Sequence, residues 1–144
     1  MAIAFEEAEA AYKRGEVPVG AVAVESNSGT IIARAGNRVE ELGDATAHAE
    51  MLVLQQTTVE LKGKRIDTVD LYVTLEPCPM CAGAISLARI RRLYFAAYDP
   101  KTGGVDHGPK VFDHSTCHHK PHVVGGIDEV RASTLLKKFF AERR

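Results

Sequence analysis

The sequence lacks the features that would place the protein in a membrane or outside the cell. No apolar run among its 144 residues approaches the roughly 20 residues that span a bilayer. Residues 1–7 end on two glutamates, whereas a secretory signal begins with a basic region and continues with a long apolar one. Only three cysteines are present, two of them spaced C-x-x-C, so a disulfide framework is not expected. We therefore expect a cytoplasmic protein without a membrane partner.

The chain also lacks a strong charge of either sign. Its formal net charge of −1 argues against a strongly basic nucleic-acid binder, although a local basic patch can still serve that role. Apolar residues make up 45% and charged residues 26%, which is ordinary for a globular protein. The sequence has no internal repeats, low-complexity segments or linkers, and its length fits one domain over residues 1–144.

The pattern of apolar residues predicts alternating helices and strands. We expect helices over residues 2–14, 47–56, 79–88 and 128–143, and strands over 17–24, 30–35, 69–75, 91–97 and 122–126. Thr46 is the expected N-cap of the second helix and Cys78 that of the third, with Pro79 at its first position. This order predicts an α/β fold, a three-layer α-β-α domain with a mixed five-stranded sheet. The long segment 99–122 has little regular structure, so we expect it to be functional.

Two short motifs carry the chemistry. His48 and Glu50 stand in H-A-E, and thirty positions later Cys78 and Cys81 stand in P-C-P-M-C. His48, Cys78 and Cys81 suit a zinc ion and leave its fourth position open, as catalytic zinc sites do. Water there has its pKa lowered to about 7, and Glu50 is placed to move its protons. The combined pattern is that of the zinc-dependent nucleobase deaminases, with a structural zinc, a redox pair or a chance match as the alternatives.

The motifs and their surroundings resemble the cytidine deaminase-like zinc deaminases, and within them the bacterial tRNA-specific adenosine deaminases. The likeness covers nearly the whole chain and includes residues 16–22, 37–38, 46–50, 71–78, 80–84, 99–103 and 139–144. The zinc motif is shared with guanine and cytosine deaminases. The D-x-K-T-G segment at 99–103 and the F-F…R-R ending at 139–144 favour the tRNA enzymes.

This resemblance implies a reaction and roles for particular residues. The implied reaction is the hydrolytic deamination of the wobble adenosine to inosine in a tRNA anticodon loop, by a homodimer with one zinc ion per subunit. By the same resemblance, Asn37 hydrogen-bonds the edge of the target base, the Ala49 backbone also contacts the base, and Asp99 lies beside the ribose. On sequence alone, a turn position for Asn37 and a loop cap for Asp99 before Pro100 are the alternatives.

Two positions and one region, the histidine-rich residues 106–122, depart from the pattern of the tRNA enzymes. Gly36 stands where those enzymes commonly have Trp, and Ala45 stands where Pro is common. The departures leave open a deaminase of a free nucleobase or nucleoside, such as guanine or cytosine/cytidine. A third alternative is a non-catalytic, zinc-stabilised binding subunit, in which Glu50 would be dispensable.

Two polar clusters remain to be placed. Arg89, Arg91 and Arg92, together with the basic C-terminal helix, are a candidate RNA surface, and a solvated helix face is the alternative. The segment 114–122 holds four histidines and a cysteine. We expect a polar loop at the substrate mouth there, with a second metal site as the alternative.

Overall fold

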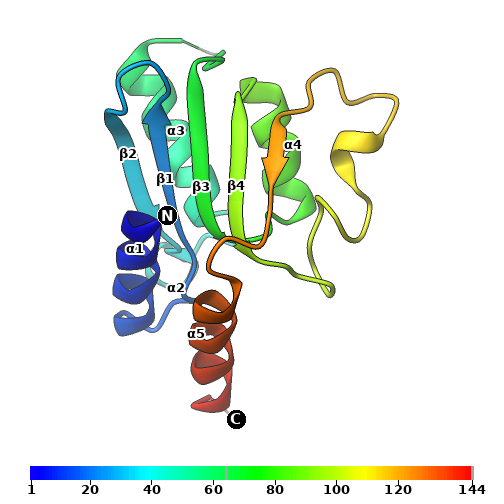
Figure 1. The fold of residues 1–144 in the computed structure, drawn as a ribbon. Helices are drawn as coiled ribbons and strands as arrows, with labels where there is room; N and C mark the ends of the chain where they lie inside the picture. Colours follow the sequence, from blue (N-terminus) through cyan, green and yellow to red (C-terminus); the bar gives the residue numbers. More distant parts are fainter. Residues whose placement is uncertain (64, 144) are drawn as a thin grey trace.

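The computed structural model describes residues 1–63 and 65–143, which form helices on both sides of one mixed sheet (Figure 1). The elements in chain order are α1 (Ala2–Lys13), β1 (Gly20–Glu25), β2 (Ile31–Gly36), α2 (Val39–Leu42), α3 (Ala49–Leu61), β3 (Val69–Leu75), α4 (Pro79–Ala88), β4 (Arg92–Ala97), the 3-10 turn η1 (Val111–Asp113), β5 (His122–Val124) and α5 (Glu129–Ala141). Lys64 and Arg144, the second of which belongs to the F-F…R-R ending, lie outside the described residues. Among the residues described, no helix combines the length and the hydropathy of a membrane span.

The sheet confirms the predicted α/β architecture. Its five strands run in the order β2-β1-β3-β4-β5. β1 pairs antiparallel with β2 and β3, whereas β3, β4 and β5 are parallel to one another. α1 and α5 cover one face of the sheet, and α3 and α4 cover the other (Figure 1). The domain therefore has the three layers expected from the element order.

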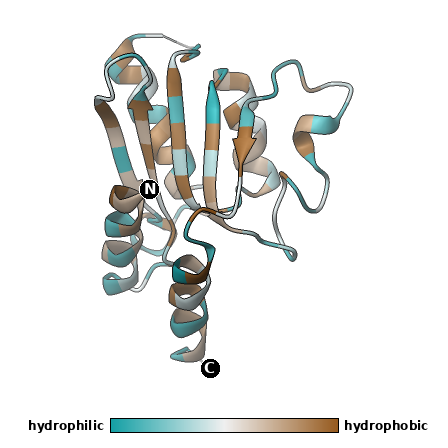
Figure 2. Cartoon of the chain, in the orientation of Figure 1, coloured by the Kyte–Doolittle hydropathy of each residue, from teal (hydrophilic) through white to brown (hydrophobic). Residues whose placement is uncertain are grey.

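Apolar clusters fill the space on each face of the sheet. The larger cluster contains Leu71 and Phe95 from the strands and Ile85 from α4, all fully buried. The smaller one joins Phe5 of α1 to Ala96, the neighbour of Phe95 in β4, because successive strand residues point to opposite faces. In Figure 2 hydrophobic residues predominate along β1 and β3, whereas α5 carries hydrophilic stretches along its length. The packed sheet thus gives a rigid base to the loops that follow β2, β3 and β4.

The start of β1 differs from the sequence prediction. The strand begins at Gly20 instead of residue 17. β1 lies between β2 and β3, and Pro18 has no N–H to donate to a neighbouring strand. The predicted strand 69–75 and helix 79–88 are confirmed with their boundaries.

The region between β2 and β3 also differs from the prediction. The short helix α2 occupies Val39–Leu42, where the sequence pattern predicts neither a helix nor a strand. His48, and not Thr46, is the N-cap of α3, and the helix continues to Leu61. The longer helix is explained by its buried face, which runs on from Val53 to Thr57, one helical turn beyond.

Candidate functional site

The three predicted metal ligands lie at the N-termini of two neighbouring helices. His48 is the N-cap of α3, Cys78 is the N-cap of α4, and Cys81 lies in the first turn of α4. Pro79 takes the first position of α4, where its missing N–H would have had no partner within the helix. β3 ends at Leu75, so the site lies beyond the carboxyl end of a parallel strand, where α/β sheets bind ligands.

The ligand atoms are spaced as a zinc ion requires. His48 Nδ1 lies 3.7 Å from Cys78 Sγ and 3.6 Å from Cys81 Sγ, and the three atoms lie within 4.8 Å of one another. Bonds of about 2.3 Å to sulfur and about 2.0 Å to nitrogen, at a tetrahedral angle, separate the two atoms by about 3.5 Å. Within residues 1–63 and 65–143, no other set of three such side chains is gathered this closely. The donor set therefore fits zinc with one position left open.

The two sulfurs are prepared for metal binding. The pKa of the Cys78 thiol is lowered to about 4, chiefly by a hydrogen bond from Cys81 and further by His48. The same hydrogen bond, together with burial, raises the pKa of Cys81. Since helix N-termini also favour negative charge, the site favours the thiolate form that binds metals.

Glu50 combines burial with a neutral-range pKa. Only 4% of its surface is exposed. This burial raises the pKa of Glu50 to about 7, against the opposing influence of a hydrogen bond from its own backbone and of the nearby His48. A carboxyl group with such a pKa can accept and release a proton at neutral pH. Glu50 does not belong to the group of possible metal ligands, which consists of His48, Cys78 and Cys81. Its carboxyl group therefore remains available to carry protons beside the metal.

A cavity of about 660 Å³ opens beside the metal centre. Its lining includes five of the predicted site residues, Asn37, His48, Glu50, Cys78 and Asp99. The other two, Ala49 and Cys81, are fully buried and lie outside this lining. The volume falls within the range of about 300–1,000 Å³ that is usual for small-ligand sites, which is enough for one nucleoside unit.

Asn37 connects the cavity wall to the start of α3. Its Oδ1 accepts a 2.8 Å hydrogen bond from the backbone N–H of Ala49. Its own backbone donates to Val19 and accepts from Arg14, which fixes its position at the end of β2. The two residues expected to contact the base therefore contact each other. Asn37 Nδ2 makes no hydrogen bond to another described residue, which leaves this donor for a ligand in the cavity.

Asp99 begins a tight turn at the rim of the cavity. Its Oδ1 accepts hydrogen bonds from the backbone N–H groups of Lys101 and Thr102, and its Oδ2 accepts one from the Thr102 hydroxyl. The loop-cap role considered from sequence is therefore present. Asp99 still lines the cavity, so capping the turn and facing a substrate are compatible.

Two buried carboxylates were not among the predicted site residues. Glu16 is 2% exposed and accepts two backbone N–H groups from α2 on one side of the cavity. Glu76 is equally buried and accepts N–H groups from segment 99–107 on the other side. A signal for Glu76 existed in the sequence, because a charged residue directly after a strongly apolar strand requires buried partners. Phe139 and Arg143, at the end of the chain, also line the cavity.

The histidine-rich segment 114–122 does not gather around a second metal. His114 donates a hydrogen bond to the Pro109 carbonyl, and His119 Nε2 donates one of 2.7 Å to the Ile90 carbonyl. Among the described side chains the metal-ligand geometry is found at His48 and its two cysteines. The segment is thus held to its neighbours by ordinary hydrogen bonds.

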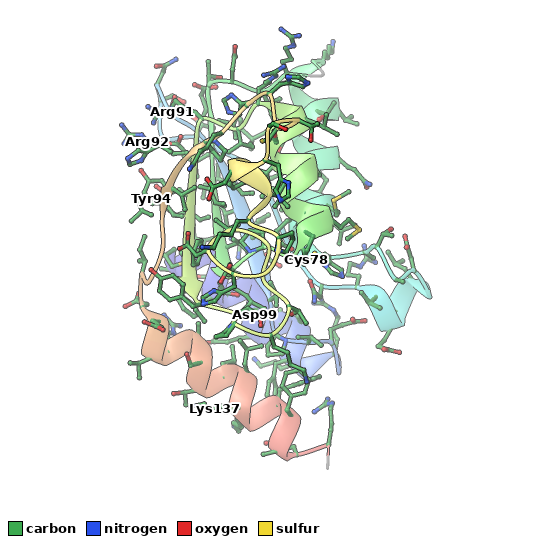
Figure 3. The ribbon with its side chains drawn as sticks, turned by 90° about the vertical axis from the view of Figure 1, so that its right-hand side faces the viewer. Cys78, Arg91, Arg92, Tyr94, Asp99 and Lys137 are labelled. Carbon is green, nitrogen blue, oxygen red and sulfur yellow. The ribbon has the colours of Figure 1, made fainter. Side chains whose placement is uncertain are left out.

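The arginines at the start of β4 lie far from the cavity. Figure 3 shows Arg91 and Arg92 at one end of the sheet, and Cys78 and Asp99 toward the other. The Arg91 guanidinium is also held by Asp70 in an ion pair of 2.7 Å. These residues therefore do not form the rim of the site.

Gly36 is one of the two single positions that depart from the expected pattern, and its presence has a packing reason. A Cβ at this position would lie 2.6 Å from the Glu7 carbonyl oxygen of α1. No side chain fits between the strand and the helix, so a Trp here would require α1 to move.

A mixed α/β sheet that presents H-x-E and P-C-x-x-C at two helix N-termini defines the class of zinc-dependent nucleobase deaminases. Residues 1–97 match the family described as the cytidine and deoxycytidylate deaminase zinc-binding region. The tRNA-specific adenosine deaminase of Agrobacterium fabrum is 51% identical over 144 residues, which cover 100% of this chain and 93% of that protein. The chain belongs to this family and, within it, to the tRNA-specific adenosine deaminases.

Solved structures show the same relationship. One from biochemical and structural studies of A-to-I editing by tRNA:A34 deaminases at the wobble position of transfer RNA matches with a TM-score of 0.91 and 51% identity, covering 94% of this chain and 97% of that chain. A guanine deaminase from Nitrosomonas europaea matches with a TM-score of 0.84 at 24% identity, covering 97% of this chain and 82% of that chain. The second likeness shows a shared fold.

Proposed function

We propose that the protein hydrolyses the wobble adenosine of a tRNA anticodon loop to inosine, releasing ammonia. The observation that carries the proposal is the position of Glu50, a buried carboxyl group that lines the same cavity as His48 and Cys78. The full-length similarity to tRNA-specific adenosine deaminases supports the choice of substrate.

The reaction divides between the metal and Glu50. His48, Cys78 and Cys81 would hold a zinc ion, and a bound zinc ion would supply a nucleophile from water at neutral pH. Glu50 accepts the proton that water loses on attack at C6 of the purine. It delivers this proton to the ring nitrogen N1. It then takes the remaining proton from the oxygen now bonded to C6 and delivers it to the amino group, which leaves as ammonia while C6 becomes a carbonyl. Burial raises the pKa of Glu50 above the ordinary value of a glutamate, which favours the uptake of a proton in each step.

The remaining predicted residues recognise the nucleotide in this proposal. Asn37 Nδ2 donates a hydrogen bond to an acceptor on the base edge, while Ala49 N–H holds the Asn37 amide in the required orientation. Asp99 and Thr102 form the turn beside the ribose. While its hydrogen bond to Asn37 is present, the Ala49 N–H contributes to base binding by orienting the Asn37 amide.

Basic side chains near the cavity supply contacts for the RNA backbone. Arg143 lines the cavity and lies with its guanidinium 3.6 Å above the Phe139 ring. Lys101 stands in the Asp99 turn, and Lys137 projects from α5 below Asp99 (Figure 3). Within the described part of the chain, neither lysine forms an ion pair, so both charges remain for phosphates. A loop base is already poorly stacked, so extruding it costs at most a few kcal/mol.

A homodimer in the cytoplasm completes the proposal. The family resemblance implies the dimer, and two apolar side chains of α4 support it, since Met80 is 36% exposed and Leu87 is 81% exposed. α4 also carries Cys81, so an interface there would lie next to the metal centre. Sedimentation of the wild type and of Leu87→Glu tests this arrangement. The wild type should sediment as a dimer and the variant as a folded monomer, whereas a monomeric wild type would contradict the proposal.

The substrate is tested by direct comparison. The zinc-loaded protein is incubated separately with an anticodon stem-loop bearing a wobble adenosine, with guanine and with cytidine, and inosine and ammonia are measured. We expect inosine from the stem-loop and no ammonia from the free compounds. Glu50→Gln serves as the control and should abolish turnover while zinc remains bound. Ammonia from guanine or cytidine alone would replace this proposal with a free-base or nucleoside deaminase.

A further inference from the structure

We propose that Glu76 is a positioning residue whose buried carboxylate fixes segment 99–107 as a wall of the substrate cavity and thereby sets the affinity for the RNA. The inference rests on the proposed function, because affinity for the RNA is one of its readouts. Glu76 follows β3 directly and is not a member of the metal-ligand group. Its role is therefore distinct from zinc binding and from proton transfer.

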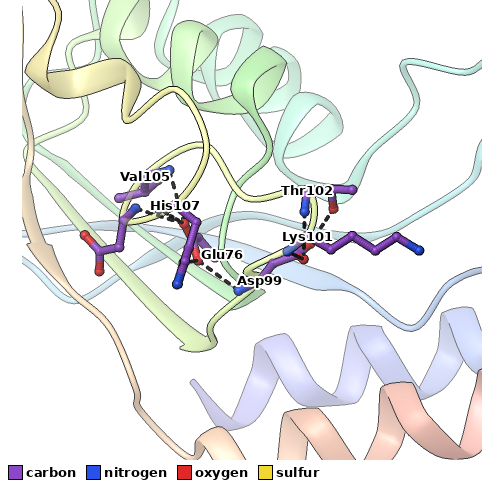
Figure 4. A network of polar contacts seen from close by, with 7 residues as sticks. Glu76, Asp99, Lys101, Thr102, Val105 and His107 are labelled. Atoms are coloured by element: carbon purple, nitrogen blue, oxygen red, sulfur yellow. Dashed lines mark hydrogen bonds and ion pairs between the residues drawn. The ribbon is translucent and has the colours of Figure 1, made fainter.

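Five hydrogen-bonding contacts converge on this one carboxylate (Figure 4). Oε1 accepts from the backbone N–H groups of Val105, Asp106 and His107 at 3.2, 2.9 and 3.0 Å. Oε2 accepts from the backbone N–H of Asp99 at 2.8 Å and lies 2.9 Å from His107 Nδ1. The side chain has no exposed surface, so water does not compete for these contacts.

The backbone of the same segment is also packed closely against the metal-binding motif. A Cβ on Gly103 would lie 2.6 Å from Glu76 Oε1, and one on Gly104 would lie 2.6 Å from Pro79 N. The Gly104 N–H donates a 2.8 Å hydrogen bond to the Pro77 carbonyl. Glycines at these positions allow the segment to approach the carboxylate and the start of α4.

The contact with Asp99 connects Glu76 to the substrate. Asp99 and Thr102 line the cavity, and the Asp99 side chain holds the turn that contains both. The Asp99 N–H is itself held by Glu76 Oε2. Releasing that N–H would free the start of the turn while leaving the metal ligands and Glu50 in place. The expected effect is therefore on binding and not on the chemical step.

Glutamine at position 76 separates these contacts. Its amide has one oxygen, and that oxygen is required at the Oε1 position, where three backbone N–H groups converge. The amide NH₂ then takes the Oε2 position. There it can donate to His107 Nδ1, whose tautomer can change, but it meets the Asp99 N–H as donor against donor. Glu76→Gln thus releases Asp99 selectively, in a side chain of nearly unchanged volume.

The test compares Glu76→Gln with Asp70→Asn in the zinc-loaded protein. Asp70 is a buried carboxylate in β3, the strand that precedes Glu76, and it lies far from the cavity, paired with Arg91, so it controls for a general loss of stability. We expect Glu76→Gln to raise KM for the stem-loop about tenfold, as the loss of one hydrogen bond does, with kcat changed less than about threefold. Its amide hydrogens in segment 99–107 should exchange faster. Asp70→Asn should change neither quantity, and both variants should keep the wild-type zinc content.

His107→Ala provides a second variant that removes one contact from the partly exposed side of the network. It should raise KM in the same direction but by less, about threefold, and it keeps the test available if Glu76→Gln does not fold. An unchanged KM in the folded variants, or a fall in kcat alone, would overturn the role in affinity. Unchanged hydrogen exchange in 99–107 would overturn the anchoring itself.

Failure of the proposed function gives a different result. If the wild-type protein makes no inosine from the stem-loop, that function is wrong. Faster exchange in segment 99–107 of Glu76→Gln would then still establish the anchor, and KM would be compared on whichever free base or nucleoside the wild type deaminates.

Discussion

Asn37 offers a substitution that separates substrate binding from folding. Its Oδ1 accepts a 2.8 Å hydrogen bond from the N–H of Ala49 at the start of α3, while Nδ2 is left for the base. Asn37→Asp keeps an acceptor for Ala49 and removes the donor. Asn37→Ala removes both. The two variants should therefore lose the same activity and differ in stability.

The magnitudes follow from these contacts. Asn37 is 8% exposed, so its loss as an acceptor leaves a buried N–H unpaired, at a cost of about 1–3 kcal/mol in the free energy of unfolding. In a domain of this size each 1 kcal/mol lowers Tm by roughly 3 °C, so Asn37→Ala should unfold roughly 3–9 °C lower. Loss of one hydrogen bond to the base costs about 1–3 kcal/mol of transition-state binding. For both variants kcat/KM should fall between about 5-fold and 150-fold.

The assay is inosine formation from the anticodon stem-loop, combined with thermal unfolding of the zinc-loaded proteins. Asn37→Asp with wild-type Tm and strongly reduced kcat/KM is the expected result. If Asn37→Asp keeps full activity, Nδ2 does not contact the base. If Asn37→Ala unfolds at the wild-type temperature, the hydrogen bond to Ala49 does not hold the cavity wall, and the account of Asn37 is wrong.

Further predictions concern the metal, the proton carrier and the core. Glu50→Gln should lower kcat about 10²–10⁴-fold with zinc content unchanged, and loss of zinc instead would contradict its role. Chelation should abolish turnover, lower Tm and be reversed by added zinc, as measured by calorimetry and inosine formation. Burial raises the pKa of Glu50 from 4.5 to about 7 in the folded protein, so its ionisation favours the unfolded chain as pH rises from 4.5 to 7. In zinc-free protein Glu50→Gln should therefore raise stability by about 3 kcal/mol at pH 8 and hardly at all at pH 4, by chemical unfolding. Phe95→Ala removes a fully buried side chain of β4, so it should lower the free energy of unfolding by about 3–5 kcal/mol, measured by the same method.

The parts of the fold that sequence reasoning predicted well are those determined by neighbouring residues. β3 is rich in β-branched and large apolar residues, and Pro79 after Cys78 marks the start of α4, so both elements appear where expected. The metal centre was predicted for the same reason, since two of its ligands lie within one helical turn. α2 was missed because its four residues have no periodicity, and its N-terminus is held by Glu16, which lies 24 and 25 residues earlier in the chain.

The walls of the cavity depend on contacts between distant residues, and this explains what the sequence could not reveal. Asn37 pairs with Ala49 across 12 residues, and Glu76 holds backbone groups 23 to 31 residues away. A local pattern shows that a carboxylate follows an apolar strand, but not which N–H groups it will accept. The reaction class could therefore be predicted from motifs, whereas the shape of the substrate site required the folded chain.

The two buried carboxylates suggest how one metal centre can serve different substrates. Glu16 and Glu76 each accept backbone N–H groups, one from α2 and one from segment 99–107, so each holds one wall of the same cavity. Backbone groups are present whatever side chains the walls carry. A wall can thus change its side chains, and with them its substrate, while the carboxylate keeps it at a fixed distance from the zinc ligands. On this reasoning the H-x-E and P-C-x-x-C motifs determine the chemistry, and the residues that line the anchored walls, Asp99 and Thr102 among them, determine what is deaminated.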